Sequence, residues 1–188
     1  MIVGRNVRFL RSKNRGLTLI ELVMAMTVLV VALVGYAKTV AMSSIASSTA
    51  REATLASEAA RQLIETMRGT TFNEIYLRYN SAAGDNPVAG VSPGANFAVA
   101  GLDARANDAD GMPGEILFPT STVGGALQLR EDLVDAQLGM PSDLTGEGVI
   151  DGLDHALNYE NLPVIVRVRW RGVGGPGQVQ FQTVLGDF

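Results

Sequence analysis

The hydrophobic pattern of the chain begins with an uninterrupted apolar run. It extends from Leu17 to Ala37, and Glu21 is its only charged residue. As a helix, this run would be about 31 Å long, close to the ~30 Å hydrocarbon core of a bilayer. The pattern therefore predicts a transmembrane helix at residues 17–37.

The pattern becomes amphipathic after this run, without a signal that would end the helix. No proline occurs before Pro87, and apolar or small residues recur at helical spacing over residues 42–67. One continuous helix is therefore expected over residues 17–68, with residues 38–69 as its amphipathic continuation. Gly69 is expected to close this helix in a left-handed cap.

Residues 70–188 combine turn-rich connections with short strand patterns. In 163–171 apolar residues alternate with arginines, and in 179–185 they alternate with glutamines. Such alternation, with a loop at Gly172–Gly177, predicts an antiparallel hairpin with one buried side. Weaker patterns predict a short helix or turn at 70–80, a long connection at 81–114, and strands at 96–100, 115–118 and 127–133.

Together these elements predict an α+β fold. A long N-terminal helix, transmembrane in its first half, is expected to pack against a small antiparallel β-sheet head, residues 70–188, which ends in the C-terminal β-hairpin. The apolar face of the hairpin, Trp170 included, is expected to lie across the second half of the helix. The opposite face carries Arg167, Arg169 and Arg171. It is expected to be solvated and to lie near acidic residues, with an anion-binding site as the alternative.

Charge predicts the orientation of the apolar helix. Five cations and no acids precede it: Arg5, Arg8, Arg11, Lys13 and Arg15. Because Lys and Arg are retained on the cytoplasmic side, we expect a cytoplasmic N-terminus and an exported head. The chain has 15 basic and 19 acidic residues, so the part that follows the basic leader, residues 1–16, would carry a net charge of −9. This acidity argues against nucleic acid as a partner.

The amino-acid composition excludes several kinds of metal site, cross-link and catalytic group. The chain has no cysteine and one histidine, His155. These counts exclude a lipoprotein anchor, a disulfide framework, and thiolate or histidine-rich metal sites. They also leave little for a nucleophile–base pair, and the glycine-rich Gly172–Gly177 lacks the lysine of a phosphate-binding loop. We therefore expect no enzymatic activity.

Glu21 is anomalous within the apolar run. A charged side chain at the centre of a membrane helix costs roughly 2.5–3.5 kcal/mol, so it needs a partner. The nearest candidate cation is the amino terminus that cleavage between Gly16 and Leu17 would create. An ordinary secretory signal is cut after its apolar segment, whereas a cut here would leave the whole apolar helix on the mature protein.

The segment Arg15-Gly16-Leu17-Thr18-Leu19-Ile20-Glu21-Leu22-Val23 closely resembles the class III signal of type IV pilins and type II secretion pseudopilins. The resemblance implies that prepilin peptidase cuts after Gly16 and methylates the new amino group of Leu17. It also implies that Glu21, the fifth mature residue, contacts the amino terminus of a neighbouring subunit during filament assembly. Leu17 departs from the Phe or Met that is commoner at the first mature position.

The resemblance implies a structural subunit, a minor pilin or pseudopilin that looks like the PilV-like group. The implied partners are prepilin peptidase, other pilin or pseudopilin subunits, the inner-membrane assembly platform and membrane lipid. The implied location is the bacterial inner membrane, as a single-pass protein, and then the pilus or pseudopilus. The alternative is a monomeric, single-pass, membrane-anchored periplasmic binding protein with an incidental glutamate in its helix.

A second motif lies in the head, at residues 143–154. Counted along this segment, the oxygen ligands of positions one, three, five, seven, nine and twelve would come from Asp143, Thr145, Glu147, the Val149 carbonyl, Asp151 and Asp154. With glycine at position six, this spacing resembles a dockerin-type calcium loop, in which Ile150 would face the core. The pattern predicts a Ca²⁺ site. The alternative is a turn that holds itself by Asx-type hydrogen bonds.

Overall fold

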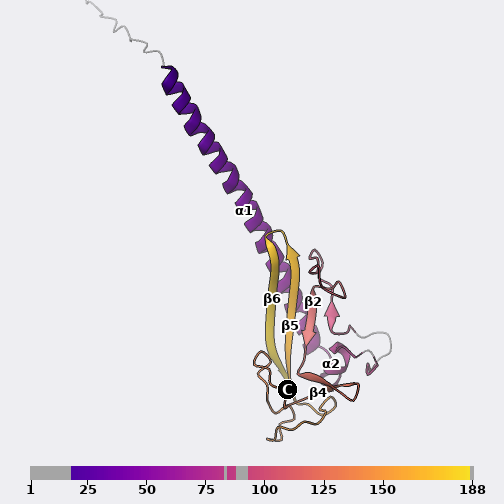
Figure 1. The fold of residues 1–188 in the computed structure, drawn as a ribbon. Helices are drawn as coiled ribbons and strands as arrows, with labels where there is room; N and C mark the ends of the chain where they lie inside the picture. Colours follow the sequence, from indigo (N-terminus) through magenta and orange to yellow (C-terminus); the bar gives the residue numbers. More distant parts are fainter. Residues whose placement is uncertain (1–17, 83, 88–92, 187–188) are drawn as a thin grey trace, which may run out of the picture. The chain divides into compact units, whose positions relative to one another are not determined.

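The computed structural model describes residues 18–82, 84–87 and 93–186 (Figure 1). The basic leader and the predicted cleavage junction, Gly16 and Leu17, lie outside these residues. The chain divides into two compact units, residues 1–44 and 45–188, and each is described here by itself.

The first element is a helix, α1 (Leu19–Arg68), that runs through 50 residues and continues from the first unit into the second. The predicted continuous helix is therefore confirmed over its described part. Its end differs from the prediction, because Gly69 does not adopt a left-handed conformation. The Gly69 N–H donates instead to the Glu65 carbonyl at 3.1 Å, and the Thr70 N–H donates to the Met67 carbonyl at 3.0 Å. The helical bonding thus tightens as the helix ends.

In the second unit, α1 packs through small side chains against a β-sheet. Ala56, Ala60, Ile64 and Met67 are buried, and their spacing of three and four places them on one helix face. The same core includes Val164, Val166, Val168, Leu162 and Ile165 of the sheet, with Ile75 and Tyr76 of the short helix α2 (Phe72–Tyr79). The predicted α+β fold is confirmed.

The sheet has four antiparallel strands in the order β1-β2-β5-β6. Their bounds are β1 Asn96–Phe97, β2 Gly114–Leu117, β5 Asn161–Gly172 and β6 Gly175–Gly186. The two long strands lie along the second half of α1 in Figure 1. A second sheet pairs β3 (Thr120–Val123) with β4 (Ala126–Leu129).

The hairpin of β5 and β6 is longer than the sequence indicates. Its pairing continues to Gly172 opposite Gly175, so the predicted loop at Gly172–Gly177 is wrong. The glycines there serve the pairing, because a Cβ on Gly177 would collide with the Trp170 indole on the opposite strand. A residue without a side chain makes room for the largest one. Trp170 is buried, as predicted.

The shorter strands also differ from the predictions. The strand expected at 96–100 ends at Phe97, and the one expected at 127–133 ends at Leu129. No strand was expected at Thr120–Val123, yet β3 forms there and turns into β4 through Gly124 and Gly125, both at positive φ. Two consecutive positive φ values are the geometry of a tight hairpin turn.

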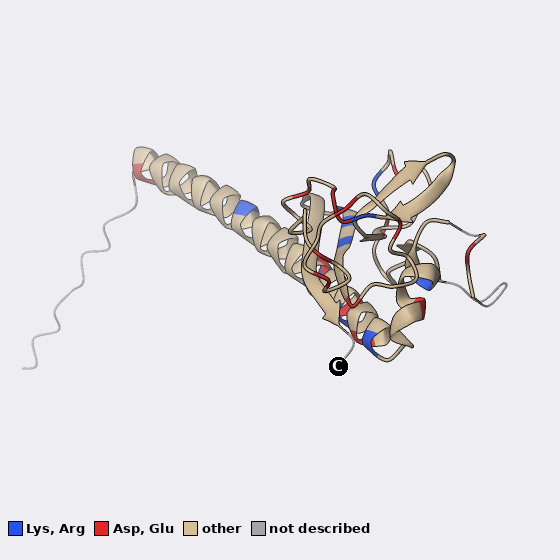
Figure 2. Cartoon of the chain, turned by 90° about the horizontal axis from the view of Figure 1, so that it is seen from below, with Lys and Arg blue, Asp and Glu red and all other residues tan. Residues whose placement is uncertain are grey.

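The arginine face of the hairpin lies against an acid of the neighbouring strand. Glu115 of β2 forms ion pairs with Arg169 at 3.1 Å and Arg167 at 3.6 Å. Arg167 also donates to Gln180 of β6 at 3.0 Å. Figure 2 shows the basic and acidic residues interspersed over the second unit. The predicted acidic neighbour is confirmed, but the face is solvated only in part, because Arg171 is exposed and Arg167 and Arg169 are partly buried.

Candidate functional site

The first candidate region is the apolar half of α1 in the first unit. Every described side chain from Thr18 to Ser44 is exposed, including Leu19 at 82 %, Val31 at 67 % and Tyr36 at 70 %. The helix is long and apolar enough to cross a membrane. A contiguous apolar surface of this size requires a cover, which a bilayer or other helices can supply.

Glu21 lies in the first turn of this helix. Its backbone N–H donates to the Thr18 hydroxyl at 3.3 Å, so Thr18 caps the helix. An acid in the first turn also interacts favourably with the helix dipole. The next cation along α1 is Lys38, about 26 Å away at the rise of a helix. No ion pair involves Glu21 within residues 18–82, 84–87 and 93–186, and its side chain is exposed.

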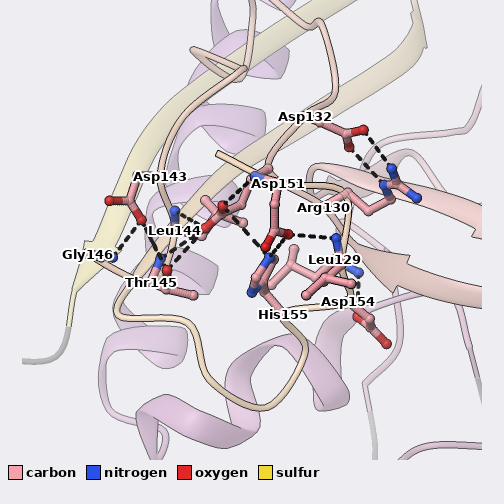
Figure 3. A network of polar contacts seen from close by, with 12 residues as sticks. Leu129, Arg130, Asp132, Asp143, Leu144, Thr145, Gly146, Asp151, Asp154 and His155 are labelled. Carbon is pink, nitrogen blue, oxygen red and sulfur yellow. Dashed lines mark hydrogen bonds and ion pairs between the residues drawn. The ribbon is translucent and has the colours of Figure 1, made fainter. Parts of the chain in front are cut away.

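The second candidate region is a polar network in the head that joins the 143–154 segment to the end of β4 (Figure 3). Glu131 is fully buried. Its Oε1 accepts N–H bonds from Leu144 at 2.7 Å and Thr145 at 3.2 Å, and its Oε2 accepts one from Asp151 at 3.3 Å. One buried carboxylate thus binds the backbone of the 143–154 segment at both its beginning and its end.

His155 and Asp151 complete this cluster. The His155 Nε2 lies 3.0 Å from Asp151 Oδ1 and 3.7 Å from Glu131 Oε2. The His155 backbone is fixed by β4, because its N–H donates to the Leu129 carbonyl at 2.9 Å. Ligand atoms of the three side chains all lie within 4.8 Å of one another. The group can therefore hold a metal ion.

The protonation of the cluster follows from its hydrogen bonds. The Leu153 N–H and the His155 ring both lower the pKa of Asp151, so this carboxylate stays ionised. With Nε2 protonated, His155 donates to Asp151. The Nδ1 atom is buried and has no hydrogen-bond partner within the described part of the chain. The ring therefore makes all its polar contacts through Nε2.

The residues predicted to bind Ca²⁺ do not surround one common point in the structure. The Asp143 carboxylate accepts N–H bonds from Thr145 at 3.0 Å, Gly146 at 2.7 Å and Gly148 at 2.6 Å. These bonds lower the pKa of Asp143, with the Gly148 N–H as the largest cause. The Thr145 hydroxyl donates to Asp143 at 3.2 Å. This is the Asx-type turn that was the alternative to a metal site.

The other predicted ligands lie elsewhere on the loop. Asp151 belongs to the cluster with His155, and Asp154 accepts N–H bonds from Leu129 at 3.0 Å and Ala156 at 3.2 Å. Glu147 and Val149 are exposed, and so is Ile150, which was expected to face the core. Of the six predicted ligands, Asp143 and Thr145 are in direct contact. The Ca²⁺ site with all six ligands remains a prediction.

Sequence reasoning missed Glu131 and the role of His155. His155 stands four residues after Asp151 and is the only histidine of the chain, which was a usable signal. The sequence contains no such signal for Glu131, because it lies 20 residues before Asp151 and contacts it only in the folded structure.

Comparison with known proteins locates similarity at the N-terminus. Residues 11–37 match the family model described as the prokaryotic N-terminal methylation motif. The match includes the junction between Gly16 and Leu17, Glu21, and the apolar run to Ala37. No curated protein matches the chain, and no solved structure does.

Proposed function

We propose that the chain is a structural subunit, a pilin or pseudopilin, of a type IV pilus or a type II secretion pseudopilus. The observation that carries this proposal is the methylation motif at residues 11–37, in register with a wholly exposed apolar helix. A motif of this kind implies processing by prepilin peptidase and assembly with other pilins. The role is structural, not catalytic.

In this proposal the peptidase cuts after Gly16 and methylates the amino group of Leu17. The apolar helix stays on the mature protein and anchors it in the inner membrane before assembly. The five basic residues ahead of the cut keep the N-terminus cytoplasmic and direct the head outward.

Assembly then replaces lipid around the apolar helix by the helices of neighbouring subunits. The positive amino terminus of Leu17 on one subunit pairs with Glu21 on another. Neither charge has a partner of its own in a lone apolar helix, and each satisfies the other inside a bundle. Removal of one partner leaves an uncompensated buried charge, which typically costs about 3–5 kcal/mol.

Within this class we propose a minor component of the PilV-like kind. The head supports this choice by its length and its many Gly and Asp residues, by its C-terminal strand pair, β5 and β6, and by the absence of cysteines from the sequence. Its further partners are the inner-membrane assembly platform and the other subunits of the filament. The alternative is a monomeric, membrane-anchored periplasmic binding protein.

Replacement of Glu21 tests the proposal. Glu21→Gln should leave insertion into the membrane intact and abolish incorporation into filaments, measured by immunoblotting of membrane and sheared-filament fractions. Glu58→Ala is the matched control, because Glu58 is an exposed acid of the same helix. Thr18→Ala is a second control, because it removes the cap on the Glu21 N–H but keeps the carboxylate.

Mass spectrometry of the native protein tests the processing step. The expected mass is that of residues 17–188 with one added methyl group. An intact leader, or absence of the parent protein itself from the filament fraction, would support the membrane-anchored monomer instead. Incorporation of Glu21→Gln equal to that of the parent would contradict the assembly role of Glu21.

A further inference from the structure

The cluster of Glu131, Asp151 and His155 places two carboxylates beside one imidazole. Glu131 is fully buried and, among the described residues, has no Lys or Arg partner. The neighbouring Arg130 directs its guanidinium to Asp132, at 2.8 and 2.6 Å. Even a protonated His155 supplies one positive charge against two carboxylates. Buried charges in proteins are paired or coordinate metals.

We propose that Glu131, Asp151 and His155 bind one divalent transition-metal ion such as Zn²⁺. The ion would fasten the segment that contains residues 143–155 to the end of β4. This site differs from the predicted Ca²⁺ loop and shares only Asp151 with it. It is also independent of the filament proposal, because all its ligands lie in the second unit.

The spacing of the ligand atoms fits such an ion. With metal–ligand bonds of about 2.1 Å, two ligands of a tetrahedral zinc ion lie about 3.4 Å apart. The distances from His155 Nε2, 3.0 Å to Asp151 Oδ1 and 3.7 Å to Glu131 Oε2, lie on either side of that value. Two of the three ligand pairs are therefore spaced for a small cation, and the third pair, Glu131 with Asp151, lies within 4.8 Å.

The ligands are also held in place by other contacts. Glu131 Oε1 is occupied by the N–H groups of Leu144 and Thr145, which orients Oε2 toward the cluster. Asp151 Oδ1 accepts the Leu153 N–H at 2.7 Å. Hydrogen bonds to ligating carboxylates are a regular feature of metal sites. Coordination through Nε2 would place the ring proton on Nδ1, which is buried and has no hydrogen-bond acceptor among the described residues. The three metal–ligand bonds have to outweigh the free-energy cost of this unsatisfied N–H group.

The donor set favours a transition metal over calcium. An imidazole nitrogen with two carboxylates suits Zn²⁺ and similar ions, whereas Ca²⁺ takes six to eight oxygen ligands. Three protein ligands leave a coordination position for water, and Asp151 has a partly exposed side chain through which solvent can reach the ion.

The single histidine makes the test direct. The full-length chain is labelled with ¹⁵N at its histidine, purified in detergent micelles without metal, and titrated with ZnCl₂ while the two imidazole nitrogens are followed by NMR. Binding at the cluster predicts saturation at one equivalent, with a large shift of Nε2 and a proton on Nδ1. Calorimetric titration of the same sample should give one site.

Variants separate this site from surface adsorption. His155→Gln should weaken Zn²⁺ binding at least tenfold, and Glu131→Gln should do the same with the histidine retained. Asp143→Asn is the matched control, because Asp143 is an acid of the same loop outside the cluster, and it should bind Zn²⁺ as the parent does. Circular dichroism verifies that each variant folds.

Three results would overturn the proposal: an Nε2 resonance unchanged by excess Zn²⁺, an Nε2 that keeps its proton at saturation, or equal affinity in parent and His155→Gln. The first two are measured on the unaltered protein, so they decide the question even if both variants fail to fold.

Discussion

The carboxylate of Glu52 on α1 accepts a hydrogen bond from the indole N–H of Trp170 on β5, with 3.1 Å between Oε2 and Nε1. The other oxygen of Glu52 accepts the backbone N–H of Val173, at the turn of the hairpin, also at 3.1 Å. The two bonds join the helix to the hairpin near its turn. They also satisfy the polar atom of a tryptophan whose side chain is otherwise buried.

Glu52→Ala should therefore destabilise the head. It removes the acceptor for the Trp170 N–H, and an unsatisfied buried donor costs about 1–3 kcal/mol. Trp170 is the only tryptophan of the chain, so its fluorescence reports unfolding in denaturant directly. Glu58→Ala, which removes an exposed acid further along the same helix, should change the free energy of unfolding by less than about 0.5 kcal/mol. Equal stability of the two variants would contradict this assignment.

The same tryptophan explains why the bounds of the hairpin could not be predicted. The alternation that predicts β5 and β6 stops where Gly172–Gly177 begins, and glycines usually indicate a loop. The pairing continues because Gly177 lies opposite Trp170 and leaves room for its ring. This contact joins two strands, so the sequence pattern of either strand alone does not indicate it. The long helix was predictable because its signal, an apolar run followed by helical spacing, is local.

The candidate functional residues likewise include some that local sequence patterns indicate and some that only the fold brings together. Glu21 and the junction between Gly16 and Leu17 could be predicted as a site because their spacing is fixed along the chain. Glu131 could not be found, because it meets Asp151 only after β4 and the 143–154 segment have folded together. Polar residues brought together by tertiary structure show no periodicity in the sequence, and the Asx turn at Asp143 uses the same residue types as a calcium loop.

Gly177→Ala should test the contact between strands. The added methyl group would overlap the ring of Trp170, and overpacking a filled site typically costs about 1–3 kcal/mol. Gly84→Ala is the control, since a Cβ there meets nothing within 4 Å and the residue has no positive φ. The measurement is the midpoint of thermal unfolding, and a midpoint for Gly177→Ala equal to that of Gly84→Ala would show that the ring moves freely.

Tyr159 should make the head sensitive to alkaline pH. Its hydroxyl donates to the Phe72 carbonyl at 2.6 Å and accepts the Tyr76 N–H at 3.2 Å. Burial raises the pKa of Tyr159 from 10.0 to about 12. Because the folded-state value is the higher one, the stabilisation is complete below about pH 10 and is lost as the pH rises toward 12.

Tyr159→Phe should flatten this alkaline loss of stability, seen as a smaller slope of the unfolding free energy between about pH 10 and 12. Some slope should remain, because burial also raises the pKa of Tyr76. The variant should be less stable at neutral pH by about 1–3 kcal/mol, since the Phe72 carbonyl and the Tyr76 N–H lose their partner. Tyr36→Phe, at an exposed position in the first unit, is the control. An unchanged slope in Tyr159→Phe would refute the assignment.

Binding of Ca²⁺ by residues 143–154 can be tested separately from binding of Zn²⁺ at the Glu131 cluster. If the 143–154 segment binds Ca²⁺, the ion has to displace the N–H groups that now occupy the Asp143 carboxylate. Selective binding to the folded state would then raise stability by about 2.7 kcal/mol at a hundred times the dissociation constant, and a chelator would reverse the rise in melting temperature. A melting temperature unaffected by Ca²⁺ would leave the Asx turn as the explanation of the motif.

The variants distinguish the two ions. Asp143→Asn should abolish a response to Ca²⁺ and preserve binding of Zn²⁺, whereas His155→Gln should do the opposite. Asp151→Asn should impair both, because Asp151 is the one ligand that the two sites share. A calcium response that survives Asp143→Asn and disappears in His155→Gln would place calcium in the Glu131 cluster, and the loop motif would then have no metal of its own.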